Sequence, residues 1–564
     1  MLAALLALAI PLFIAMPLWV DVTYHDLSAR NILWGGIHYR DVFETNLPGM
    51  VWLHILVRSL FGWSAEAIRG ADLVVVGSAV LLLTWWLARL GVSRIARIWF
   101  IFACAFFYLG QSEFIHCQRD CWMLLPATIA LHLRGRQLQR SRAPSATGAS
   151  LFGFGILEGI VWGCAVWIKP HALAPAIFVW LASVGRIAGG TPRRAWLADL
   201  GGLLCGGLVA GLAGSVWLIA TGTWPYLWDI LLHWNSEYYD WSLAEFQNRL
   251  NMVIMYFSPW SLIHIVSIPV ALYTLYQARP WRKDDLEIDA QLWMGRALLA
   301  ALYLGWLAQA TLLQRVFHYS HAPVLLLALA VLAARRWPVG PIFLIWSILG
   351  AALHLLAPHW PSLRDGLAAF QECKPYTYQQ LVPQPALFDP ERLQLWPRAV
   401  REGGTPELWD RLTHYPGIHC VPDWEDLERM AEHLRGMGIK DGELICWYDS
   451  THPLYLQLGI WPALRFMHIT TALRFESHWD DIRREVIASG HRYVVSDMAV
   501  LRFYYAFSDD SPPGRPYDLP IDFPEVARDV YPWNQPVLFR IGRYTLHEVR
   551  YPIDKIMFPV PKKK

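Results

Sequence analysis

Four polar sites, each at the end of an apolar run, hold the residues of this chain that could do chemistry. Asp21 follows the first apolar run, Asp120 precedes the run at 121–133, and Lys169 stands between two further runs. The fourth site, QRVFHYSHAP, lies between two late apolar runs and carries Arg315, His318, Tyr319 and His321. Ionisable groups near membrane depth are costly and usually functional, so each site needs a physical reason.

Each site taken alone also has a plain structural explanation. A carboxylate at Asp21 can simply solvate a helix exit, and Asp120 can stabilise a helix N-terminus through the helix dipole. Lys169 fits the snorkelling of a long cationic side chain to the water interface. The fourth site is harder to dismiss, because a cation with two histidines and a tyrosine within seven residues suits phosphate binding.

Taken together, the sites provide the groups needed to transfer a group from a phosphate-linked donor. A carboxylate can deprotonate or orient the acceptor, and cations can neutralise the phosphate leaving group as charge develops on it. None of the histidines on these segments has a metal-ligand spacing such as HExxH, so we expect no metal site.

The elements that must position these residues are transmembrane helices. The 564 residues are 55% hydrophobic and 17% charged, against about 25% charged in a typical globular domain. About eleven spans are predicted, at 2–20, 71–90, 95–113, 121–133, 151–168, 171–185, 197–220, 251–277, 291–313, 320–334 and 338–356. The first run lacks a basic region and a cleavage site, so we expect a retained helix. Residues 50–62 are too short to cross and fit an interfacial or re-entrant helix.

Basic residues alternate between the connections, which predicts the orientation. Arginines cluster at 89–97, 134–142, 186–194, 279–283 and 335–336, whereas the intervening connections carry few. By the positive-inside rule, the N-terminus is then cytoplasmic and all four polar sites lie outside the cytoplasm. The formal net charge of +2 gives no reason to expect nucleic acid as a partner.

The chain changes in composition at about residue 358, where prolines and charged residues become frequent. DLERMAEHLRGMG predicts an amphipathic helix with a glycine stop, and ELICWY and RYVVSDM predict short buried strands. We therefore expect residues 1–357 to form the membrane domain, with a first extracytoplasmic loop at 21–70 that carries juxtamembrane helices. Residues 358–564 are expected to form one soluble extracytoplasmic domain of α/β or α+β class.

The first loop resembles that of GT-C glycosyltransferases of the protein mannosyltransferase and ArnT type. Such loops read as Asp, then Tyr and Ala, then Gly-Gly-x-x-Tyr-Arg-Asp and Pro-Gly; the matching positions are Asp21, Tyr24, Ala29, Gly35, Gly36, Tyr39, Arg40, Asp41, Pro48 and Gly49. Asp120, Lys169-Pro170 and His318-Tyr319 with Pro323 resemble later motifs in the family's order. The family often has Asp-Glu at its first acidic site, but here Val22 follows Asp21, and Asp26 is the candidate substitute.

The resemblance implies a GT-C-like membrane enzyme of a bacterial inner membrane. Its expected reaction is the inverting transfer of a sugar from a polyprenyl phosphate to a glycan, lipid or protein acceptor outside the cytoplasm. Asp21 and Asp120 would be the catalytic acids, and the donor phosphate would be held by Lys169, Arg315, His318 and Tyr319. Secondary candidates are Asp26, Tyr39, Arg40, Arg119 and His171. No cofactor is expected, although one branch of the superfamily uses a divalent metal.

Two other classes compete with the enzyme. A transporter or flippase of lipid-linked sugars would place its polar residues near the membrane midplane, often on broken helices, whereas here they cluster at span ends. A non-catalytic envelope scaffold would need only the C-terminal domain, which carries no motif of its own.

Overall fold

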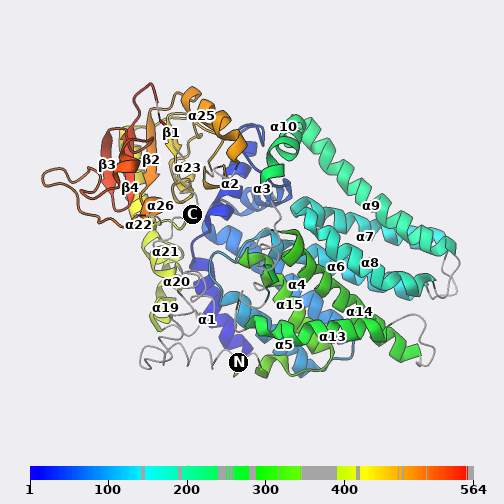
Figure 1. Ribbon diagram of the computed structural model, residues 1–564. Helices are drawn as coiled ribbons and strands as arrows, with labels where there is room; N and C mark the ends of the chain where they lie inside the picture. The colour runs from blue at the N-terminus through cyan, green and yellow to red at the C-terminus, as the bar shows by residue number, and fades with distance from the viewer. Residues whose placement is uncertain are drawn as a thin grey trace.

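The structure is a computed structural model, shown in Figure 1. It describes residues 1–141, 147–188, 193–238, 249–250, 253, 257, 260–278, 287–314, 317–342, 344–345, 348, 390–413, 420–467, 469–472, 475–502, 505–553 and 555–556.

A bundle of helices fills the N-terminal part, and every predicted apolar run up to 320–334 contains one. These helices are α1 (Leu2–Ala15), α4 (Ala65–Arg89), α5 (Arg94–Leu109), α6 (Arg119–Ser141), α7 (Gly148–Ile168), α8 (Leu173–Ala188), α9 (Arg193–Ala220), α13 (Ile263–Gln277), α14 (Glu287–Ala308) and α15 (His318–Ala334). The predicted run at 338–356 lies mostly outside the described residues.

Four helical stretches among the described residues are long and apolar enough to cross a membrane: Ala65–Arg89, Gly148–Ile168, Ala195–Ala220 and Leu292–Leu313. A fifth span results if α1 and α2 (Val20–Leu33), which are bent by 59° at their junction, are counted together. The chain is thus a membrane protein by length and composition of these helices. The number of about eleven spans stays a prediction, because helices such as α8 and α15 are shorter.

The bend between α1 and α2 begins the polar loop. Met16 and Trp19 both have extended backbones, and Pro17 between them cannot donate a helical hydrogen bond. The carbonyl of Pro17 instead accepts a hydrogen bond from the buried guanidinium of Arg69 on α4. The end of α1 is therefore fixed to the bundle at the point where α2 turns away.

Helix α3 (Gly49–Phe61) lies where the sequence predicts a short non-crossing helix at residues 50–62. A Cβ atom on Gly49 would overlap the backbone of Trp167 and Ile168 at the end of α7. Only glycine permits this close approach, so the Pro48-Gly49 pair sets the start of α3 against the residue that precedes Lys169.

The described residues from Pro390 onwards combine short helices with a mixed sheet; this part is called the C-terminal domain below, and its start at residue 358 stays a prediction. Its strands are β1 (Leu444–Cys446), β2 (Tyr493–Asp497), β3 (Val537–Ile541) and β4 (Tyr544–Glu548), in the order β1-β2-β4-β3, where only β1 and β2 pair in parallel. Its helices are α19 (Pro390–Gln394), α20 (Trp396–Glu402), α21 (Pro406–Leu412), α22 (Trp424–Met437), α23 (Pro453–Leu458), α24 (Ile469–Ala472), α25 (Trp479–Ala488), α26 (Ala499–Arg502) and α27 (Glu525–Arg528). The predicted amphipathic helix and both predicted strands are α22, β1 and β2.

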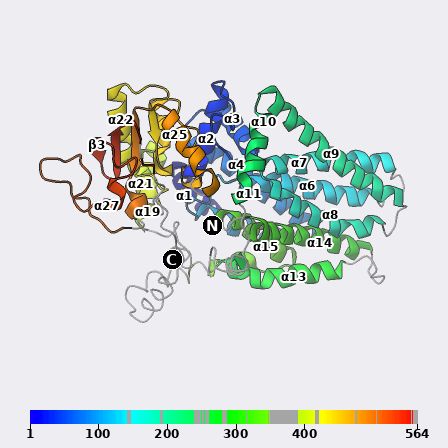
Figure 2. The same cartoon turned by 45° about the horizontal axis from the view of Figure 1, so that its top comes forward.

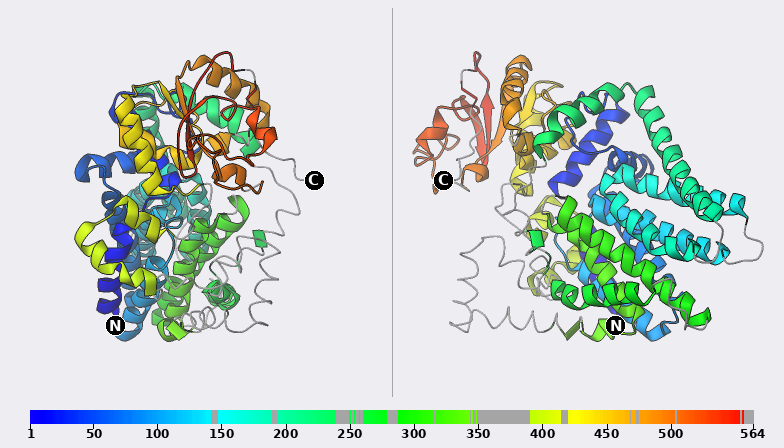
Figure 3. Two further views of the ribbon diagram at one scale, coloured as in Figure 1. Left: turned by 90° about the vertical axis from the view of Figure 1, so that its left-hand side faces the viewer. Right: turned by 45° about the vertical axis from the view of Figure 1, so that its right-hand side comes forward.

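Helix α2 lies between the bundle and the C-terminal domain, as Figure 2 shows. Tyr24 and Leu27 of α2 pack into the core formed by α22 and the sheet. Arg30 donates hydrogen bonds to the carbonyls of Tyr455 at 2.8 Å and Ile460 at 3.1 Å. Both views of Figure 3 place the sheet at the end of the molecule opposite the N-terminus. The first loop and the C-terminal domain therefore share one end of the bundle.

Candidate active site

Four helix ends bring the predicted lysine, an acid and an aromatic ring together. Asp120 lies in the first turn of α6, Lys169 directly follows α7, and Tyr319 lies in the first turn of α15. Gln314 directly follows η4 (Gln309–Leu313), the π-helical end of the α14 segment. Each of these residues terminates or begins a helix, which explains why polar side chains separated by up to two hundred residues meet at one end of the bundle.

The ammonium of Lys169 is the centre of this cluster. Its Nζ lies 2.6 Å from Oδ2 of Asp120, and it also donates to the amide oxygen of Gln314. The amide nitrogen of Gln314 donates to the other Asp120 oxygen at 3.0 Å. The ring of Tyr319 lies 5.7 Å from Nζ, within range of a cation–π interaction. All four side chains are buried.

Burial lowers the pKa of Lys169 to about 8, although the neighbouring Asp120 carboxylate favours the charged form. The lysine is thus a cation at neutral pH that is close to losing its charge. A lowered pKa of this kind is typical of functional sites in a cleft, although structural ion pairs also produce it.

Asp21 lies in the first turn of α2, half-buried, where a carboxylate also interacts favourably with the helix dipole. An aromatic chain connects its neighbourhood to the lysine cluster. The ring of Trp19 lies 4.7 Å from that of Phe114, and Phe114 lies 5.3 Å from Tyr319. This series of ring contacts links the start of α2 to the start of α15, where the lysine cluster lies.

Asp449 of the C-terminal domain and Asp21 both lie within electrostatic reach of Cys420. Burial raises the pKa of the Cys420 thiol, and the negative charges of Asp449 and Asp21 add to this. Asp449 begins the turn η6 (Asp449–Thr451) after β1. His452 directly follows this turn, and its ring centroid lies 5.9 Å from that of Tyr24 on α2.

The structure gives contacts for two of the other predicted residues near the donor site, His318 and His171. The ring of His318 lies 5.6 Å from that of Phe114, next to Tyr319. Arg315 lies outside the described residues. His171 donates to the carbonyl of Leu313 at 3.1 Å, which holds the segment after Lys169 against the end of η4.

Asp26 does not stand beside Asp21. Its carboxylate accepts hydrogen bonds from His54 at 2.8 Å and from Nε of Arg58 at 2.7 Å, and all three side chains are buried. Residues five apart on a helix point about 140° apart, so Asp26 faces α3 while Asp21 faces elsewhere. The ion pair joins α2 to α3 and gives Asp26 a structural role in this arrangement.

Two secondary candidates, Tyr39 and Arg40, organise the loop between α2 and α3. The Tyr39 hydroxyl donates to the carbonyl of Asn46 at 2.6 Å, and its backbone has a positive φ of 69°. Burial raises the pKa of its phenol, Glu44 adds to this, and the positive charge of Arg119 opposes it, so Arg119 lies within electrostatic reach of the loop. Arg40 binds Asp41 at the surface, with Nε 2.6 Å from the carboxylate.

Three buried polar residues at this end of the bundle were not predicted. Gln314 bridges Lys169 and Asp120, and the guanidinium of Arg249 donates to the Gln314 carbonyl. His38 is fully buried, and neither ring nitrogen has a hydrogen-bond partner among the described residues. Burial lowers the pKa of His38 to about 3, so it is a neutral group. No group of three or more metal-ligating side chains occurs within the described part of the chain.

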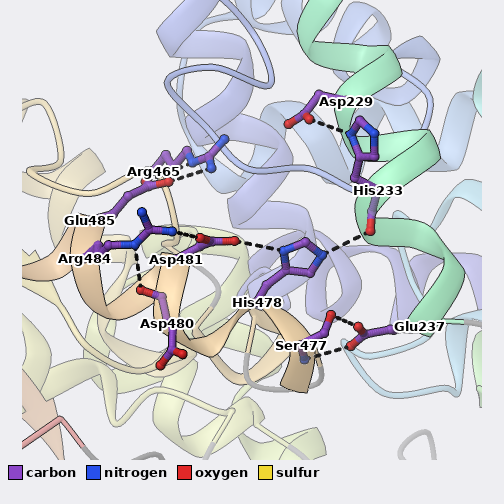
Figure 4. Close-up of polar contacts among 10 residues, drawn as sticks. All are labelled: Asp229, His233, Glu237, Arg465, Ser477, His478, Asp480, Asp481, Arg484 and Glu485. Carbon is purple, nitrogen blue, oxygen red and sulfur yellow. Dashed lines mark hydrogen bonds and ion pairs between the residues drawn. The ribbon is translucent and has the colours of Figure 1, made fainter.

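The segment after α9 contacts the C-terminal domain, as the close-up in Figure 4 shows. This segment comprises α10 (Trp224–Asp229), η2 (Ile230–Trp234) and α11 (Asn235–Tyr238). His478 stacks on Trp234 with 3.9 Å between ring centroids and donates to the His233 carbonyl at 3.0 Å. The carboxylate of Glu237 accepts hydrogen bonds from Ser477. The segment after α9 and the C-terminal domain are thus joined to each other.

Comparison with known proteins identifies the fold. No family model matches the sequence, and no curated protein matches it either. In structure, the chain resembles ArnT from Cupriavidus metallidurans bound to undecaprenyl phosphate, with a TM-score of 0.54 and 14% identity over 97% of this chain and 96% of that one. The apo form of that ArnT gives a TM-score of 0.47 with 14% identity, over 90% and 95% of the chains. The oligosaccharyltransferase AglB from Archaeoglobus fulgidus, in complex with an inhibitory peptide and a dolichol-phosphate, gives 0.40 with 13% identity over 87% and 67%. The chain therefore has the fold of ArnT, as the sequence resemblance predicted.

Proposed function

We propose that this protein is an integral-membrane glycosyltransferase that moves a sugar from a polyprenyl phosphate to an acceptor outside the cytoplasm, with inversion at the anomeric carbon. The observation that carries the proposal is the buried Lys169 ammonium, held at the meeting point of four helix ends by Asp120 and Gln314. An ArnT of the same fold has been crystallised with undecaprenyl phosphate.

Lys169 is suited to the donor phosphate. An ammonium has three N–H donors, and its hydrogen bonds to Asp120 and Gln314 use two of them, which leaves one for a phosphate oxygen. Asp120 and Gln314 are positioning residues in this proposal, since their atoms are engaged by each other and by Lys169. Tyr319 closes one side of the ammonium. Arg315 and His318 are proposed as further phosphate contacts from the start of α15.

Asp21 is proposed as the base. Its carboxylate takes the proton of an acceptor hydroxyl as the acceptor oxygen bonds to the anomeric carbon. The bond from that carbon to the phosphate oxygen breaks, and the lipid phosphate leaves with its negative charge next to Lys169. Attack opposite to the leaving phosphate inverts the anomeric carbon. Asp449 approaches the same region from the C-terminal domain, which gives that domain a route to influence the acceptor.

Transfer by Asp21→Asn protein in proteoliposomes, supplied with radiolabelled polyprenyl-phosphate sugars, tests the proposal. Asparagine keeps the size of the side chain but cannot accept the proton, and general-base catalysis contributes about 10²–10⁴-fold in rate. We expect transfer to fall by this factor. Asp480→Asn is the matched control, because Asp480 is exposed on α25 and should leave transfer unchanged. Wild-type turnover by the Asp21→Asn protein would remove Asp21 from the reaction.

A further inference from the structure

We propose that a tryptophan-lined pocket beside α2, separate from the lysine cluster, is a carbohydrate-binding site. The pocket has a volume of about 440 Å³ and lies between α2, the start of α4 and helices α21 to α23 of the C-terminal domain. Four tryptophans line it, namely Trp34, Trp63, Trp409 and Trp424. Pockets of this size with a few polar groups among aromatic walls are typical of small-molecule sites.

The pocket lies on the opposite face of α2 from Asp21. Thr23, Asp26, Arg30 and Trp34 line it, and their spacing of three and four residues places them on one helix face. Asp21 precedes Thr23 by two residues, which turns it about 160° away at 100° per residue. The pocket is therefore not part of the region proposed for transfer.

Unpaired hydrogen-bonding groups indicate what kind of molecule the pocket takes. The indole N–H groups of Trp409 and Trp424 have no acceptor among the described residues, and the amide oxygen of Gln457 has no donor there. Trp424 is only 5% exposed. Buried polar groups without partners are rare and costly, so a ligand that supplies both acceptors and donors fits the pocket. Hydroxyl groups do both.

The cations at the pocket are already engaged, which disfavours an anionic ligand. Arg58 binds Asp26, and Arg30 donates to two carbonyls of the C-terminal domain. Their guanidinium groups lie over the rings of Trp63 at 5.6 Å and Trp34 at 4.6 Å, which holds these indoles in position. A phosphate head group would find no uncommitted cation there, and an alkyl chain would leave the indole N–H groups unpaired.

A sugar ring satisfies all of these constraints. Its C–H faces can lie against the indole rings that line the pocket, and its hydroxyls can both donate to and accept from polar groups there. The rim tryptophans Trp34 and Trp63 are 47% and 44% exposed, so a ring that lies against them leaves the rest of a glycan in solvent. The occupant is thus an uncharged saccharide unit, presented at the end of the molecule that carries the C-terminal domain.

Saturation-transfer NMR on the full-length protein in nanodiscs tests this inference, with the methyl glycosides of glucose, galactose, mannose and N-acetylglucosamine as probes. We expect saturation transfer to at least one glycoside. Trp63→Ala removes an exposed rim indole, and Trp424→Phe removes a buried N–H while keeping an aromatic ring. Each should weaken binding at least about threefold, whereas Trp228→Ala, an exposed tryptophan on α10, should not.

The test also separates this inference from the proposed transfer reaction. Lys169→Met should raise the KM for the lipid donor and leave glycoside binding unchanged, because Lys169 does not line the pocket. The absence of NMR saturation transfer to all four methyl glycosides would overturn the inference. Binding that is unaffected by Trp63→Ala would do the same, and this rim variant remains informative if Trp424→Phe fails to fold. Displacement of the glycoside by phospholipid head groups alone would reassign the pocket to lipid.

Discussion

Replacing Lys169 by methionine is the perturbation that tests the cluster most sharply. Methionine keeps an unbranched side chain of similar length but removes the ammonium that Asp120 and Gln314 hold. Two losses follow. The donor phosphate loses a charged hydrogen-bond donor, and the carboxylate of Asp120 is left buried without its cation.

The two losses have different magnitudes and different readouts. A hydrogen bond to a charged group contributes about 1.5–3 kcal/mol, so the KM for the lipid donor should rise about 10- to 150-fold. Breaking a buried ion pair by removing one partner costs about 3–5 kcal/mol of folding free energy. Combining Lys169→Met with Asp120→Asn removes both charges and should recover much of the stability. The raised KM should remain in the double variant.

The assay measures initial transfer rates against donor concentration in proteoliposomes, with thermal unfolding of the same preparations. Lys440→Met, the same substitution at an exposed lysine of the C-terminal domain, is the control and should change neither quantity. If the double variant folds as the wild type does and keeps its KM for the donor, Lys169 does not bind the phosphate. The reasoning from the cluster would then be wrong.

Three further predictions follow from the same contacts. Because burial lowers the pKa of Lys169 from its ordinary 10.5 to about 8, the ammonium is present below pH 8 and is lost above it. The KM for the lipid donor, measured from pH 6 to 10, should therefore be constant up to about pH 8 and then rise about tenfold per pH unit. Lys169→Arg should abolish this rise, because a guanidinium stays charged over the whole range. Arg58→Met should lower the free energy of unfolding by about 3–5 kcal/mol, since it leaves the buried Asp26 carboxylate with only the hydrogen bond from His54, and denaturation midpoints would show whether it does. Gly49→Ala should force α3 away from Trp167 at a cost of about 1–3 kcal/mol, and unchanged stability would contradict the close approach described above.

The helix positions could be predicted because hydrophobicity decides them. The apolar runs can be recognised from hydrophobicity that depends only on neighbouring residues in the sequence. The same holds for α22, where Asp423 accepts a hydrogen bond from Asp426 at the start and Gly438 adopts a left-handed conformation at the end. Such local signals act on the backbone within a few residues and do not depend on tertiary packing.

The partners of the candidate site residues could not be predicted, because long-range packing decides them. Gln314 is an uncharged residue at the end of an apolar run, and its role appears only when η4 places it beside Asp120 and Lys169. His54 and Arg58 are different, since their spacing of four residues puts both on one face of α3. That spacing was a signal that α3 has a polar face, although it could not indicate Asp26 as the partner.

Buried charges inside the bundle also escaped prediction. Arg134 on α6 binds Glu158 of α7 with Nε 3.0 Å from the carboxylate, and Asp199 of α9 at 2.8 Å. The sequence assigned Arg134 to a basic cytoplasmic connection, because the predicted run ended at residue 133 whereas α6 continues to Ser141. The pairing of three helices through one arginine depends on helix ends that hydrophobicity alone does not define.

The most direct test of the central claim is where the lipid phosphate binds. A cryo-electron microscopy structure of the full-length protein in nanodiscs with undecaprenyl phosphate would show it. We predict density for the phosphate within hydrogen-bond distance of the Lys169 ammonium, on the side that Asp120 and Gln314 leave open. Phosphate density elsewhere, with the Lys169 cluster unchanged and closed by protein, would contradict the proposed donor site.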